Sequence, residues 1–152
     1  KHEMSIRNPS EGFCRFLKIN PELNMQNLWK VACTDSSKKM EYVTLIRIGG
    51  MQARAGLCPL CGKISHDRIL HISMNCPITL DDRNHLMESL FSYMPPVIYR
   101  EFCDQVDDDI LIMLLGGLNE ISEHLELEDW INVIRLSTKY FIKIKDITYS
   151  IQ

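Results

Sequence analysis

The sequence contains no apolar run long enough to cross a bilayer. The longest uninterrupted run, Ile110–Leu115, has six residues, whereas a membrane helix needs about 20. The first residues, Lys1-His2-Glu3-Met4, lead into polar sequence and show no secretory signal. We therefore predict no membrane partner and an intracellular location, in the nucleus or the cytoplasm.

The sequence also lacks the cysteine pattern of a disulfide scaffold. Three of its six cysteines, Cys14, Cys33 and Cys103, are scattered along the chain and odd in number. Proteins that depend on disulfides are found mainly outside the cell or in other oxidising compartments. The scattered thiols favour a reducing interior.

Signatures of catalysis are missing as well. There is no Gly-rich phosphate loop, since Gly49-Gly50 and Gly116-Gly117 lie within helical patterns. Ser, His and Asp occur without a nucleophile motif. A cluster of carboxylates could hold a divalent ion in a nuclease, but no nearby lysine or histidine completes a recognisable pattern, and acidic residues are also favoured at a helix N-terminus. The acidic residues concerned are Glu101, Asp104, Asp107, Asp108 and Asp109. The chain has neither polymerase nor nuclease motifs, and we expect no enzymatic activity of its own.

What the sequence does contain is a set of metal-ligand residues: Cys58, Cys61, His71 and Cys76, spaced Cys-x2-Cys-x9-His-x4-Cys. Three thiolates and one imidazole make a closed ligand set, typical of structural zinc. Gly62 follows the two-residue turn, so that the backbone can fold back and direct N–H groups at the sulfurs. We predict one Zn²⁺ held by these four residues.

A second histidine competes for the third ligand position. His66 would give the spacing Cys-x2-Cys-x4-His-x9-Cys, whose first half matches the compact retroviral zinc knuckle. His71, however, is flanked by the apolar residues Leu70 and Ile72, as an inward-facing side chain would be. We prefer His71, and His66 remains the alternative.

The remaining sequence predicts a mainly α fold, a helical array stapled by one CCHC zinc knuckle. Apolar residues recur at spacings of three and four, and Pro21 and Pro96 can each open a helix. Thr79 with Asp82 resembles a capping box. Helices are predicted at 21–33, from residue 36 or 37 to just before 56, and at 80–91, 96–106, 110–121 and 127–144.

Charge is distributed unevenly along the chain. Residues 1–76 hold 11 Lys/Arg and 6 Asp/Glu, a net charge of +5. Residues 77–152 hold 6 Lys/Arg and 14 Asp/Glu, a net charge of −8. We predict a single zinc-stapled domain over 1–152, with basic N-terminal helices (1–57), the zinc knuckle (58–76) and acidic C-terminal helices (77–152). A phosphate backbone would be attracted to the basic half.

Motifs over residues 38–92 resemble a known family. The segment Val43–Gly49, the turn Cys58-Pro59-Leu60-Cys61-Gly62, the segment Ile69–Pro77 and the later Arg83 are similar to the C-terminal zinc-binding region of non-LTR retrotransposon reverse transcriptases. The chain differs from the usual pattern at His66 and at Ser73-Met74-Asn75. The resemblance implies the same four zinc ligands and contact with RNA or DNA near the basic helix and the knuckle.

Two functions therefore remain open. The first is a nucleic-acid-binding accessory domain of a retrotransposon-type reverse transcriptase, which binds RNA, or possibly target DNA, beside the remainder of the enzyme. Its predicted contacts are cations on the basic helix and the knuckle: Lys38, Lys39, Arg47, Arg54, Lys63 and Arg68. The second is a zinc-stapled helical module that binds another protein through its acidic C-terminal half (77–152). It is favoured by the lack of aromatic residues near the knuckle, because single-strand binders use them to stack bases.

Overall fold

The structure is a computed structural model that describes residues 56–117 and 120–151. Over these residues the chain is mainly α-helical and carries one Cys/His cluster, which confirms the predicted fold class. The helices predicted between residues 21 and 55 lie outside the described residues.

Two short strands and a series of helices make up the described fold. The strands are β1 (Gly56–Leu57) and β2 (Ile64–Ser65), paired antiparallel with Gly56 opposite Ser65 and Leu57 opposite Ile64. The α-helices are α4 (Arg68–Leu70), α5 (Leu80–Phe91), α6 (Pro96–Asp104), α7 (Asp107–Leu114) and α8 (Leu127–Ile151). Three tighter or wider helical turns connect them: the π-helical η2 (His71–Asn75) and the 3₁₀ turns η3 (Pro77–Thr79) and η4 (Ser122–His124).

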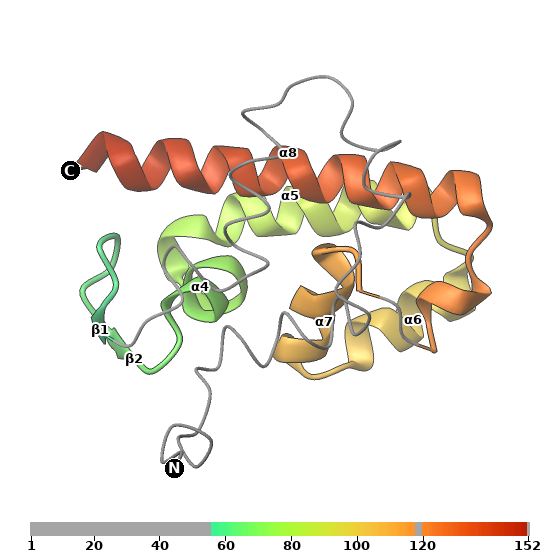
Figure 1. The fold of residues 1–152 in the computed structure, drawn as a ribbon, viewed down its shortest axis with the longest axis horizontal. Coiled ribbons are helices and arrows are strands. Elements are labelled where there is room, and N and C mark those ends of the chain that lie inside the picture. The colour runs from blue at the N-terminus through green and yellow to red at the C-terminus, as the bar shows by residue number, and fades with distance from the viewer. Residues whose placement is uncertain (1–55, 118–119, 152) are drawn as a thin grey trace, which may run out of the picture.

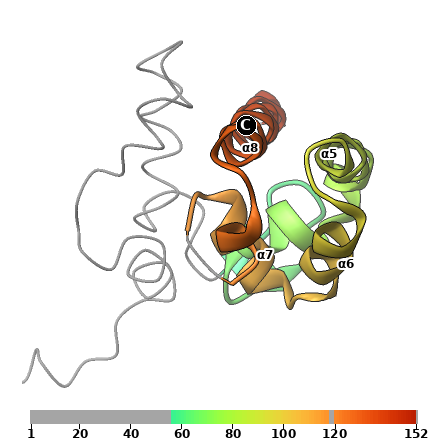
Figure 2. The same cartoon turned by 90° about the vertical axis from the view of Figure 1, so that its right-hand side faces the viewer.

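The long helix α8 and helix α5 run side by side in opposite directions (Figure 1). Figure 2 looks along these two helices and shows α6 and α7 beneath them. The strands and α4 lie at the end of the array where α5 begins and α8 ends (Figure 1). The hairpin and the metal-ligand residues are thus placed against one end of the α5–α8 pair.

Pro96 opens α6 as predicted, whereas Thr79 does not cap α5. Pro96 occupies the first turn of α6, where its missing N–H has no helical acceptor to lose. Thr79 precedes α5 as predicted, but its side chain makes no capping hydrogen bond. The capping-box prediction with Asp82 is therefore wrong, because the Thr79 hydroxyl bonds instead to the carbonyl oxygens of Ile72 and Cys76.

Two helix ends also differ from the prediction. Helix α7 ends at Leu114 rather than near residue 121, because Gly116 adopts a positive φ of 88°. The N–H of Gly116 donates to Met113 O and that of Gly117 to Ile112 O, the paired bonds of a glycine C-cap. Helix α8, in contrast, extends beyond the predicted residue 144 to Ile151.

One hydrophobic core joins the helices to the metal-ligand region. Phe102 from α6, Leu111 from α7 and Phe141 from α8 are fully buried. Ile69 and Ile72, which flank His71 in sequence, are fully buried in the same cluster. The segment between the second cysteine and the last therefore contributes to the helical core and is not a separate appendage.

Within the described residues, no helix combines the length and the apolar character that crossing a membrane requires.

Candidate metal centre

The first half of the candidate metal site is a hairpin between β1 and β2. The N–H of Cys58 donates to Lys63 O over 2.8 Å, and the N–H of Gly62 donates to Cys58 O over 2.9 Å. Gly62 has a φ of 77°, a left-handed conformation that glycine adopts without strain. The N–H of Leu60 points at Cys58 Sγ from 3.4 Å. The backbone thus folds back toward a sulfur as the Cys-x2-Cys-Gly pattern predicts.

The second half is a short helical segment that carries His71. Asp67 caps it: the Asp67 carboxylate accepts a hydrogen bond from Leu70 N over 3.1 Å, although Asp67 itself is buried. The segment then widens into the π-helical turn η2, which Cys76 N closes by donating to His71 O over 2.7 Å. This turn returns the chain so that Cys76 lies beside the first cysteine. Single π-turns are common at functional sites.

The four predicted ligands meet in one cluster. One donor atom from each of Cys58, Cys61, His71 and Cys76 lies within 4.8 Å of the other three. Cys58 Sγ and Cys76 Sγ are 3.9 Å apart, and Cys61 Sγ lies 3.2 Å from His71 Nε2. No other group of Cys, His, Asp and Glu side chains among the described residues gathers in this way. His66, the alternative histidine, is exposed and outside the cluster.

These separations fit a tetrahedral ion. With zinc–sulfur bonds of about 2.3 Å, two thiolates on a tetrahedral zinc are about 3.8 Å apart. A thiolate and an imidazole nitrogen are then about 3.6 Å apart. The two separations lie close to these values, and the cluster as a whole, within 4.8 Å, would have to contract modestly around an ion of this size. A set of three sulfurs and one nitrogen suits zinc among the common divalent metals.

The protonation of the cluster is set by burial and by nearby N–H groups. The backbone N–H of Lys63 lowers the pKa of the Cys61 thiol by a hydrogen bond to the sulfur. Burial lowers the pKa of the His71 imidazole, with smaller contributions from Lys63 and Arg83, which favours the neutral form that binds metals. Burial raises the pKa of the Cys76 thiol to about 11, so that this thiol keeps its proton until a cation replaces it.

Side chains from the helices surround the His71–Cys76 half of the cluster. Thr79 and Arg83 contact the backbone of this half, and Tyr140 reaches it from α8. The sequence predicts Thr79 as a helix cap and predicts no particular role for Tyr140. Arg83 was singled out only by the family resemblance. The signal in the sequence was the hydroxyl groups of Thr79 and Tyr140, because a buried hydroxyl rarely lacks a hydrogen-bond partner.

The predicted nucleic-acid contacts are only partly described. Lys63 is exposed on the hairpin, and the half-buried Arg68 packs beside Gly56. The other four predicted contacts, Lys38, Lys39, Arg47 and Arg54, lie outside the described residues. The acidic residues of 107–109 form the first turn of α7, where the helix dipole favours negative charge.

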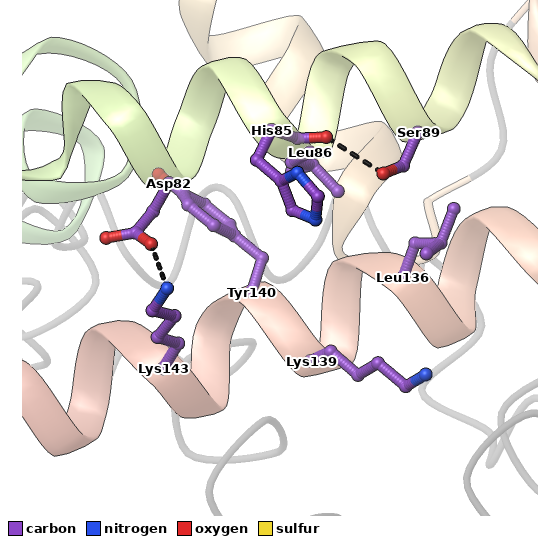
Figure 3. A pocket seen from close by; sticks show the side chains of 8 residues that line it. All are labelled: Asp82, His85, Leu86, Ser89, Leu136, Lys139, Tyr140 and Lys143. Atoms are coloured by element: carbon purple, nitrogen blue, oxygen red, sulfur yellow. Dashed lines mark hydrogen bonds and ion pairs between the residues drawn. The ribbon is translucent and has the colours of Figure 1, made fainter.

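A groove between α5 and α8 is lined by residues of both helices. Figure 3 shows Tyr140 extending from α8 toward α5, beside Asp82. Lys143 and Asp82 form an ion pair across one end of the groove. The ion pair links the two helices close to the point at which α5 leaves the metal-ligand region.

Comparison with known protein families, with curated proteins and with solved structures finds no match for this chain.

Proposed function

We propose that this chain is a zinc-binding, nucleic-acid-binding accessory domain of a reverse transcriptase of the non-LTR retrotransposon type, with RNA as the first choice of ligand and DNA as the second. The observation that carries the proposal is the gathering of Cys58, Cys61, His71 and Cys76 within 4.8 Å. These are the four positions that the family resemblance assigns to zinc. The role of the ion is structural, because four protein ligands leave no open position for a substrate or a water.

Charge on the hairpin supports the nucleic-acid part of the proposal. Lys63 is exposed between the second cysteine and β2, and Arg68 follows at the start of α4. The sequence that precedes the hairpin carries most of the excess positive charge of residues 1–76. A zinc-held hairpin would present Lys63 to a phosphate backbone in a fixed position.

The metal part is tested by elemental analysis of the purified chain. We expect one zinc per chain in the parent and a marked loss in Cys76→Ser, because that change removes one of the four ligands. The matched control is Cys103→Ser, which alters an exposed cysteine outside the cluster and should retain the full zinc content. A parent without zinc, or a Cys76→Ser variant with undiminished zinc, would show the assignment to be wrong.

The nucleic-acid part is tested by salt titration of binding to a structured RNA and to a DNA duplex. Each phosphate contact that is lost should weaken binding for all sequences and reduce the slope of log affinity against log salt by about one unit. We expect Lys63→Ala to reduce the slope by about one unit. Arg47→Ala combined with Arg54→Ala should reduce it further.

The control for the salt titration is Arg100→Ala. Arg100 is exposed on α6 in the acidic half of the chain, so that its loss changes the net charge as much as Lys63→Ala does without touching the hairpin. Zinc content should be the same in all variants. Unchanged affinity in the variants of the basic half would contradict the proposal.

An exposed apolar face of the hairpin favours a second candidate, a module that binds another protein. Leu57 and Ile64 are cross-strand partners, and their exposed fractions are 60% and 82%. Such partners lie on the same face of a two-stranded sheet, and a phosphate backbone would leave this face uncovered. A zinc-loaded parent that binds neither RNA nor DNA in a salt-dependent way would favour this second candidate.

A further inference from the structure

The turn that carries His71 and Cys76 leaves backbone carbonyl groups without helical partners. It is a single π-helical turn, and the chain leaves helical conformation at Cys76, whose ψ is 129°. The last carbonyl groups of a helical segment have no N–H groups ahead of them to accept from. Buried carbonyl groups in this position require other donors.

Side chains from outside the turn supply these donors. The Thr79 hydroxyl lies 2.7 Å from Ile72 O and 3.1 Å from Cys76 O. Arg83 Nη1 donates to Thr79 Oγ1 over 3.1 Å and to Cys76 O over 3.4 Å. Because a threonine hydroxyl has one hydrogen, the consistent assignment is that Thr79 donates to Ile72 O and accepts from Arg83. Arg83 then adds a second donor to Cys76 O, which also accepts from the N–H of Thr79 over 3.3 Å.

A third donor comes from the far end of the chain. The Tyr140 hydroxyl, on α8, donates to Ser73 O over 2.5 Å, across 67 positions of sequence. Tyr140 and Ser73 are both buried, and burial raises the pKa of Tyr140 to about 12, so that the hydroxyl remains a donor at neutral pH. Figure 3 shows the Tyr140 side chain extending from α8 toward α5, beside the Asp82–Lys143 ion pair.

We infer that Thr79, Arg83 and Tyr140 are positioning residues of the metal centre, which hold the η2 turn in the shape that places His71 and Cys76 at chelating separation. None of the three belongs to the ligand set, and each acts through a carbonyl oxygen between His71 and Cys76 or on Cys76 itself. The inference rests on the proposed metal site. It also gives a role to Arg83, which the family resemblance includes without one, and it links the metal centre to the packing of α8.

The experiment measures zinc affinity by competition with a chromophoric chelator, together with the visible absorption spectrum of the Co²⁺-substituted protein. Tyr140→Phe and Thr79→Val each remove a hydroxyl and change the shape of the side chain little. Loss of an outer partner of a metal ligand typically weakens metal affinity about 10–100-fold. We expect a loss of this size in both variants, with an altered Co²⁺ spectrum.

Matched controls separate positioning from general loss of stability. Tyr99→Phe also removes a hydrogen bond from a tyrosine to a backbone carbonyl, that of Met87, away from the metal centre. Thr148→Val removes a buried threonine bond to Ile144 O within α8. Both controls should bind zinc as the parent does. Thr79→Ser, which keeps the hydroxyl, should restore affinity to within a few-fold of the parent.

If Tyr140→Phe and Tyr99→Phe have the same zinc affinity and the same Co²⁺ spectrum, the inference for Tyr140 is overturned. The same comparison of Thr79→Val with Thr148→Val decides it for Thr79. If Thr79→Val fails to fold, Tyr140→Phe still decides the matter, since it removes only a hydroxyl. A parent that binds no zinc would instead contradict the proposed metal site, and the two failures are therefore distinguishable.

Discussion

At the scale of single residues, the environment of each histidine distinguishes His71 from His66. His71 lies between half-buried Leu70 and fully buried Ile72, on the segment that packs into the core. His66 is exposed beyond β2. The apolar neighbours of His71 in the sequence were sufficient to predict which histidine faces the cysteines. The capping-box prediction failed at Thr79, because local sequence cannot show that the carbonyl oxygens of Ile72 and Cys76 compete for its hydroxyl.

This difference between the histidines predicts opposite effects of two alanine substitutions. His66→Ala should leave zinc stoichiometry and affinity unchanged. His71→Ala removes a ligand and should weaken zinc binding at least as much as the loss of an outer partner, which costs about 10–100-fold. Elemental analysis and chelator competition on the two variants provide the measurement. Equal zinc affinity in the two variants would mean that His71 is not the ligand, and a loss confined to His66→Ala would transfer that role to His66.

At the scale of elements, the sequence predicted which helices form better than where they end. The prolines at 95 and 96 correctly predicted the break between α5 and α6. The apolar pattern after Asp109 continues through residues 110–115, so that periodicity alone carried the predicted helix past its true end at Leu114. The glycine C-cap at Gly116 ends α7, and a glycine in a helical pattern is an ambiguous signal, since it can equally mark close packing.

The β1–β2 hairpin could not be predicted from turn residues. It contains no Asn-Gly or Asp-Gly pair, and each strand has only two residues. Its turn is built around Cys58 and Cys61, with hydrogen bonds between Cys58 and the residues Gly62 and Lys63. Isolated hairpins are at best marginally stable in water. We therefore expect this one to depend on the metal cluster that its turn helps to form.

At the scale of the whole molecule, the Cys/His cluster and the helical core form one structural unit. Cys58 and Cys76 are buried in the same hydrophobic cluster as Ile69, Leu111 and Phe141. Tyr140 on α8 bonds directly to the η2 turn. This coupling between the cluster and α8 could not be inferred from the sequence alone, because it depends on a contact between residues more than sixty positions apart. It implies that loss of a bound metal would lower the stability of all the described helices.

The last prediction concerns removal of the metal from the whole domain. A ligand that binds only the folded state stabilises it by roughly 2.7 kcal/mol when its free concentration is 100 times Kd. For a domain of about 150 residues, 1 kcal/mol corresponds to roughly 2–4 °C in Tm. We therefore expect a chelator to lower Tm by about 5–10 °C. Helix content and the fluorescence of the buried Trp130 should change in one shared transition, because the cluster and the helices share a core.

Cysteine substitutions provide the controls for this measurement. Cys103→Ser should show the same chelator-dependent shift in Tm as the parent, because Cys103 is exposed and outside the cluster. Cys58→Ser should unfold at the low Tm with or without added zinc, since it removes a buried ligand from the hairpin. Chelated parent protein that unfolds at the zinc-loaded Tm would show that the metal does not support the fold. Two separate transitions would show instead that the hairpin and η2 unfold independently of α5 and α8, and that the contacts made by Tyr140 and Arg83 do not couple them.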